Sequence, residues 1–130
     1  MNKLETYQAY ADKCADKLGI DCKPVLRWQT SDCKLHRDVN AHCHIIDDHR
    51  PPAAPFPRGT ICLSRKRMPA KSLKGWRYTI AHEVAHLSVR SNHSTATFAR
   101  RMVALGVANN YDRDTIKREK YFRKRFKASS

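Results

Sequence analysis

IAHEVAHLSVRSNHSTATF, residues Ile80 to Phe98, carries three of the seven histidines of this 130-residue chain within twelve positions, around a single glutamate. In an α-helix, residues four apart lie one turn apart on the same face. His82 and His86 would then direct two imidazoles at one point, with Glu83 beside them. This geometry requires that the first half of the stretch be helical.

The surrounding residues predict a helix from about Ser72 to about Arg90. Ser72 is a favourable N-cap residue. Apolar residues recur at helical spacing and form one stripe, made of Trp76, Ile80, Val84 and Leu87. At about 100° per residue, both histidines fall well off this stripe. They are therefore expected to face something other than the main core.

The histidine spacing is H-E-x-x-H, which binds zinc in metallopeptidases. A third histidine, His93, follows His86 after six residues. In an unbroken helix it would lie about 10 Å beyond His86, too far to share an ion, but Ser91 and Asn92 both favour a helix end. A catalytic zinc needs three protein ligands and an open position. We therefore predict one zinc ion per chain, held by His82, His86 and His93.

Glu83 is adjacent to the ligands without being one, so it is the expected general base and acid of the reaction. Two alternatives are histidines that bind no metal, and a purely structural zinc, which would leave the glutamate unused and a coordination position open. Tyr111 is a further candidate, for stabilising an oxyanion, although its spacing has no signature. Trp28 and Trp76 are expected in the core.

The segment TIAHEVAHLSVRSNHSTATFARRMVAL, residues 79–105, resembles the active-site core of the small gluzincin-like metallopeptidases grouped around SprT, the WLM domain and the YgjP-like proteins. These proteins carry H-E-[LV]-x-H-L, then N-H-S or G-H-G, then a phenylalanine. The resemblance implies that His82, His86 and His93 are zinc ligands and Glu83 the catalytic residue. It also matches Ser94 and Phe98 to the residues that follow the third ligand.

The chain departs from the family in two ways. The gap of six residues between His86 and His93 is one longer than in YgjP-like members, and the zinc ribbon that often follows in SprT proteins is absent. The H-x-x-G-x-x-H glycine of metzincins is also missing, which disfavours that branch.

The chain is long enough for one domain with its own core, spanning residues 1–130. Residues 4–18 read as an amphipathic helix stopped by Gly19. Three strands are expected in residues 24–30, 40–46 and 60–65, and the four prolines of residues 47–59 mark an exposed loop. The predicted fold is α+β, with an N-terminal helix, a small three-stranded sheet, the zinc-binding helix and C-terminal helices. These last helices are residues 95–107, capped by Ser94, and a basic tail or helix over 111–130.

The net charge of +14 is concentrated in the second part of the chain, where residues 58–130 hold 18 Lys and Arg against 4 Asp and Glu. The two richest segments are Arg58–Arg77 and Arg113–Lys127. A polyanion, nucleic acid first, is the default partner for such a surface. The alternative is a solvated basic face. The residues expected to contact DNA are Arg65, Lys66, Arg67, Arg123, Lys124 and Arg125.

The five cysteines include no C-x-x-C pair, which argues against a disulfide framework and a zinc ribbon. We do not expect a second metal site from Cys33, His36, His42, Cys43 and His44, because alternate residues of a strand face opposite sides. The N-terminus lacks an apolar signal region, and no segment approaches eighteen apolar residues. A cytoplasmic protein with reduced thiols and no membrane contact is the expectation.

These features predict a zinc metalloendopeptidase that hydrolyses peptide bonds in protein substrates, in association with DNA. A substrate peptide is expected to add as a strand beside residues 60–65, taken as an edge strand. One alternative is an ImmA-like peptidase that cleaves a repressor and does not need His93. Another is a non-enzymatic DNA-binding protein, although residues 102–116 fall out of register with a helix-turn-helix motif.

Overall fold

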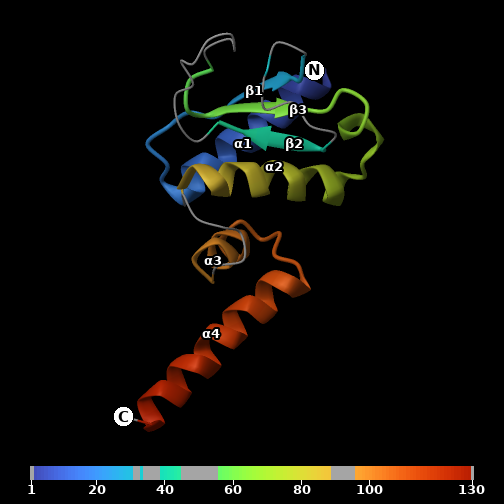
Figure 1. Ribbon diagram of the computed structural model, residues 1–130. Coiled ribbons are helices and arrows are strands. Elements are labelled where there is room, and N and C mark those ends of the chain that lie inside the picture. Colours follow the sequence, from blue (N-terminus) through green and yellow to red (C-terminus); the bar gives the residue numbers. More distant parts are fainter. Residues whose placement is uncertain (1, 31–32, 34–38, 45–55, 89–95, 130) are drawn as a thin grey trace.

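The computed structural model describes residues 2–30, 33, 39–44, 56–88 and 96–129, with side chains as far as Tyr121 (Figure 1). Its elements in chain order are α1 (Lys3–Leu18), β1 (Val25–Trp28), β2 (Ala41–Cys43), β3 (Thr60–Leu63), the 3-10 helix η1 (Met68–Ala70), α2 (Leu73–Ser88), α3 (Ala96–Ala104) and α4 (Asn110–Ser129). The predicted α+β fold, with an N-terminal helix, a small sheet and C-terminal helices, is confirmed.

Helix α1 begins and ends at residues that suit those positions. The Asn2 side chain accepts a hydrogen bond from the Glu5 amide at 2.9 Å, which satisfies one of the unpaired first-turn N–H groups. Gly19 has a φ of 64°, a left-handed conformation that glycine adopts without a steric penalty, and it stops the helix as predicted. The face turned to the core carries Tyr7, Ala11, Cys14 and Ala15.

The sheet has the strand order β1-β3-β2, with β1 parallel to β3 and β2 antiparallel to it. All four residues of β3 are buried, which fits a central strand. The expectation that residues 60–65 form an edge strand is therefore wrong. The strand between β3 and α2 is β2, which runs along α2 in Figure 1.

Helices α1 and α2 pack on one face of the sheet, and α3 and then α4 follow on the far side of α2 (Figure 1). The predicted apolar stripe of α2 points into this core. Trp28 and Trp76 both pack on Tyr7, with ring centroids 6.2 Å and 5.0 Å away. The fully buried members of the core include Ile61, Leu63, Met68, Ile80, Val84, Leu87, Phe98 and Met102.

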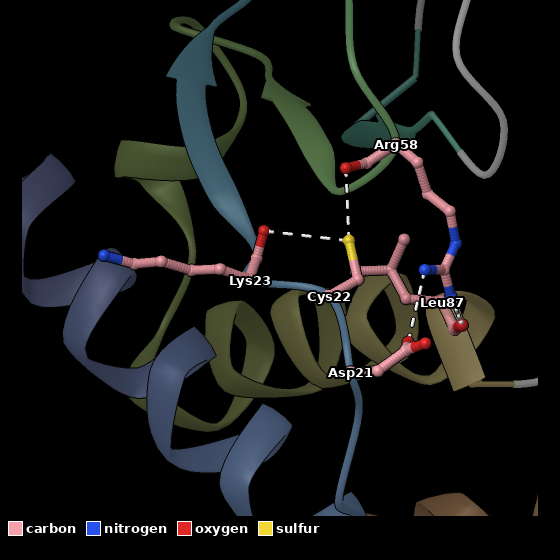
Figure 2. A network of polar contacts seen from close by, with 5 residues as sticks. All are labelled: Asp21, Cys22, Lys23, Arg58 and Leu87. Atoms are coloured by element: carbon pink, nitrogen blue, oxygen red, sulfur yellow. Dashed lines mark hydrogen bonds and ion pairs between the residues drawn. The ribbon is translucent and has the colours of Figure 1, made fainter.

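Arg58 ties the loop before β1 to the end of α2 (Figure 2). Its Nη2 donates to the Leu87 carbonyl at 2.8 Å, and its Nη1 lies 3.3 Å from Oδ1 of Asp21. The Cys22 thiol donates to the Arg58 carbonyl at 3.1 Å. A cation at a helix C-terminus is stabilised by the partial negative charge of the last carbonyls. The Arg58 side chain therefore links the segment before β1 to the end of α2, and it is engaged in these contacts instead of contributing to an exposed basic surface.

The connection between α3 and α4 is closed by a reciprocal cap. The Asn109 side chain accepts from the Asp112 amide at 2.8 Å, and the Asp112 carboxylate accepts from the Asn109 amide at 3.0 Å. This pair satisfies two N–H groups at the start of the helix. Helix α4 therefore begins at Asn110, slightly earlier than the sequence indicated.

Candidate functional site

His82 and His86 lie one turn apart on α2, and their Nε2 atoms are 3.2 Å apart. Two nitrogen ligands of a tetrahedral zinc ion lie about 3.3 Å from each other, given metal–nitrogen distances of about 2.0–2.1 Å. The two imidazoles therefore fit as ligands of one ion. Both side chains are half-buried and lie off the apolar stripe, as the helical periodicity predicted.

Phe98 of α3 supports both imidazoles from one side. Its ring centroid lies 5.0 Å from that of His82 and 4.7 Å from that of His86. The phenylalanine is almost fully buried, so its position is set by core packing. This contact couples α3 to the histidine pair and restricts the rotation of both rings.

Glu83 is buried between α2 and the edge strand β2, with 8% of its surface exposed. Burial raises the pKa of this carboxyl group to about 7, and a hydrogen bond with the Cys43 thiol acts in the opposite direction. Burial likewise raises the pKa of Cys43, and the Glu83 charge adds to that effect. A carboxyl group with a pKa near neutrality is suited to taking up and releasing a proton at neutral pH.

A groove of about 1310 Å³ opens onto His82 and Glu83. It is bounded by α1, the first turns of α2, the start of β2 and the connection from α3 to α4. A polypeptide in this groove would pass beside the carboxyl group of Glu83.

Tyr78 lies in this groove, one turn before His82, with its ring centroid 5.9 Å from the imidazole. Its hydroxyl oxygen accepts a hydrogen bond from Nδ2 of Asn109 at 2.8 Å. Tyr111, the tyrosine that the sequence offered for this role, lies on α4, is half-exposed and lines a separate small depression. The spacing of four residues between Tyr78 and His82 is the signal that could have identified Tyr78.

His93, the predicted third ligand, lies outside the described residues, as do Ser91, Asn92 and Ser94. Of the predicted zinc site, the structure brings the His82 and His86 imidazoles together, and it places the carboxyl group of Glu83 on the same helix against Cys43 of β2.

A second cluster of potential ligands lies on the opposite face of the sheet. The ligand atoms of Cys33, His42, His44 and Cys62 all lie within 4.8 Å of one another, so this Cys2His2 group can hold a metal ion. The expectation that Cys33, His42 and His44 would not converge is wrong. Cys43 does not join them, and His36 lies outside the described residues. His42 and His44 are two residues apart and share one strand face, whereas Cys43 between them points to Glu83.

Cys62 completes this cluster, although the sequence did not predict it as a ligand. It lies directly opposite His42 in the antiparallel register of β2 and β3. Burial raises the pKa of the Cys62 thiol to about 11, against a hydrogen bond from the Arg27 guanidinium that lowers it. The only sequence signal was its place in T-I-C-L, between two apolar residues that point to the core.

The predicted DNA contacts fall in two separate places. Arg65, Lys66 and Arg67 are exposed in the turn after β3, where the Arg65 guanidinium lies 5.2 Å from the centre of the Trp28 ring. Arg123, Lys124 and Arg125 belong to α4, which extends away from the sheet (Figure 1), and their side chains lie outside the described set. The two sets of three basic residues therefore lie on separate elements of the fold.

Comparisons with protein-family models, with curated proteins and with solved structures found no match to this chain. Among the described helices, none has the length and apolar character needed to cross a membrane.

Proposed function

We propose that the protein is a zinc-dependent metalloendopeptidase that hydrolyses peptide bonds in protein substrates. The observation that carries the proposal is the pair of Nε2 atoms 3.2 Å apart, on the same helix as a buried glutamate that lines a groove. A buried carboxyl group is costly to keep ionised, so a buried glutamate in this position points to a role in the chemistry.

In this proposal His82 and His86 hold the zinc ion, with His93 as the third ligand. Zinc supplies Lewis-acid chemistry, polarising a carbonyl group and lowering the pKa of water. Glu83 takes the proton from the attacking water and passes it to the leaving amine. The Tyr78 hydroxyl accepts from Asn109, so its own hydrogen is left to donate to the developing oxyanion.

The edge strand β2 offers a place for an extended substrate. The amide of His44 donates to Thr60, and the carbonyl of Asn40 accepts from Ser64, so both groups face β3. In an antiparallel pair the intervening residues turn their backbone groups the other way. Ala41 and Cys43 therefore present theirs to the side facing away from β3, where a peptide can add as a strand.

The charge of the groove favours an acidic substrate. Among the described residues that line it, Glu83 is the only acid. The basic residues around it are Lys13, Lys17, Lys71, Lys74, Arg77 and Arg113. Clefts lined by one sign of charge concentrate ligands of the opposite sign.

The experiment compares Glu83→Gln with wild type, using labelled casein, an unfolded acidic protein, as substrate. The amide cannot accept the proton, so kcat/KM should fall by at least about 100-fold while zinc content and circular dichroism stay unchanged. Asp114→Asn, the same change at an exposed site on α4, is the control and should keep full activity. Proteolysis that persists in Glu83→Gln would assign the general base elsewhere.

His93→Ala separates this proposal from the repressor-cleaving alternative, because an ImmA-like site does not need a histidine there. Loss of zinc and activity in this variant supports the three-histidine site. Full activity would favour the ImmA-like alternative.

A further inference from the structure

We infer that Cys33, His42, His44 and Cys62 form a closed structural zinc site on the sheet face opposite the groove. This inference is independent of the proposed peptidase function, because the two sites share no ligand. It raises the expected zinc content from one ion per chain to two.

The distances between the ligand atoms match a tetrahedral ion. Cys33 Sγ lies 3.3 Å from His42 Nε2 and 3.6 Å from His44 Nε2, and Cys62 Sγ lies 3.7 Å from His44 Nε2. With zinc–sulfur and zinc–nitrogen distances of about 2.3 Å and 2.0–2.1 Å, a tetrahedral sulfur–nitrogen edge is about 3.6 Å long. The cluster therefore needs little rearrangement to bind zinc.

The donor set and its burial indicate a structural role. Two thiols and two imidazoles complete the coordination of zinc, so no position is left for water or substrate. Cys33, His44 and Cys62 are each no more than 2% exposed. Soft thiolates also select zinc over magnesium or calcium, which prefer oxygen ligands.

The sheet explains why the ion is needed here. Leu26 and Ile61 pair in register and point to the helices, while their neighbours Arg27 and Cys62 point to the other face. In the described part of the chain, no helix covers that second face. A zinc ion would join β2, β3 and the segment at Cys33, as metals do where a small domain cannot complete its core with apolar residues.

Two neighbours hold the proposed ligands in place. Arg27 Nη1 donates to Cys62 Sγ at 3.5 Å, a contact that favours the thiolate form required for metal binding. The Phe56 ring lies 5.0 Å from the His44 ring and beneath the Arg27 guanidinium, 4.6 Å away. These contacts restrict water access to the cluster.

The test begins with the full chain purified under reducing conditions. Zinc measured by mass spectrometry should reach two ions per chain. After exchange for Co²⁺, the protein should show a thiolate-to-cobalt charge-transfer band. The histidine site on α2 has no thiolate in its proposed ligand set, so this band reports the Cys2His2 site alone.

Variants then assign each ion. The double variant His82→Ala/His86→Ala should keep one zinc and the thiolate band, and Cys62→Ser should lose the band. Cys22→Ser is the matched control, because this thiol belongs to neither proposed ligand set and binds the Arg58 carbonyl instead, and it should keep the band. Should Cys62→Ser fail to fold, the wild-type stoichiometry and spectrum still decide the question.

Wild-type protein with no thiolate band, or with a Cys33–Cys62 disulfide under reducing conditions, would overturn the inference. Protein that keeps the band while it cleaves no peptide would leave the structural zinc standing and remove the peptidase proposal. The two failures are therefore distinguishable.

Discussion

Three side chains of α2 carry most of the proposed chemistry, and each is positioned by a different neighbour. His82 lies against Phe98, Glu83 against Cys43, and the Tyr78 hydroxyl against Asn109. Because these neighbours come from α3, β2 and the connection before α4, the site depends on both the helical layer and the sheet. Helix α2 alone would bring the two imidazoles to one side, but it would not fix the orientation of their rings.

Tyr78→Phe tests the proposed oxyanion donor. Removing one preorganised donor should lower kcat by about 10²-fold or more and leave KM and zinc content nearly unchanged. Tyr111→Phe is the matched control on α4 and should keep wild-type kcat. Wild-type kcat in both variants would remove Tyr78 from the mechanism. A loss of kcat confined to Tyr111→Phe would make Tyr111, the residue suggested by the sequence, the oxyanion donor.

At the level of residues, helical periodicity was sufficient to place His82 and His86 on one face off the apolar stripe. The same reasoning could not find Cys62, because its neighbours His42 and Arg27 are set by strand register, which depends on long-range pairing. Strand periodicity was also applied wrongly to His42 and His44, because the whole His-Cys-His run was taken to alternate between the two faces of the strand. Residues two apart on a strand lie on the same face.

At the level of elements, the sequence predicted the existence of each helix and strand well, since each has its own periodicity or end signal. The expectation that residues 60–65 form an edge strand was wrong, because the hydrophobic pattern alone does not state which strand lies in the centre. This affects the proposed function, because the strand edge available to a substrate peptide belongs to β2 and not to β3. Strand β2 lies directly above α2 in Figure 1.

Arg58→Ala tests the contact that fixes the C-terminal end of α2, close to His86. Losing a charge-assisted bond to the Leu87 carbonyl should cost about 1–2 kcal/mol of unfolding free energy. Arg100→Ala removes an exposed ion pair with Glu119 and should cost no more than about 0.5 kcal/mol. Urea denaturation measures both, and an equal loss in the two variants would contradict the role of Arg58.

At the level of the whole molecule, we propose that the two basic segments bind DNA, so that substrates held on DNA come within reach of the groove. The observation in favour is the exposure of Arg65, Lys66 and Arg67 in one turn. Affinity should fall steeply with salt, because each phosphate neutralised releases condensed counterions.

Replacing Arg123, Lys124 and Arg125 with glutamate should weaken binding to all DNA sequences alike, since these residues would contact phosphates. Loss of three phosphate contacts would reduce the salt slope on double-stranded DNA by about 2.7. The same change at Arg65, Lys66 and Arg67 should act separately, because the two segments lie apart. Titration of labelled DNA at several salt concentrations measures both, with zinc content as the control. Binding that is absent at low salt, or unaffected by either change, would leave the charge as a solubility feature.

Strand β2 lies between the two proposed metal sites, since His42 and His44 face one of them and Cys43 faces Glu83 of the other. In the two proposals, one face of this strand therefore serves stability and the other serves chemistry. The central claim is that an ion lies between His82 and His86.

Anomalous diffraction from crystals of the purified protein, recorded on both sides of the zinc absorption edge, tests this claim most directly. The account predicts one zinc peak bonded to the Nε2 atoms of His82 and His86 and a second within the Cys2His2 cluster. A fully folded, proteolytically active protein with no anomalous peak at His82 and His86 would contradict it.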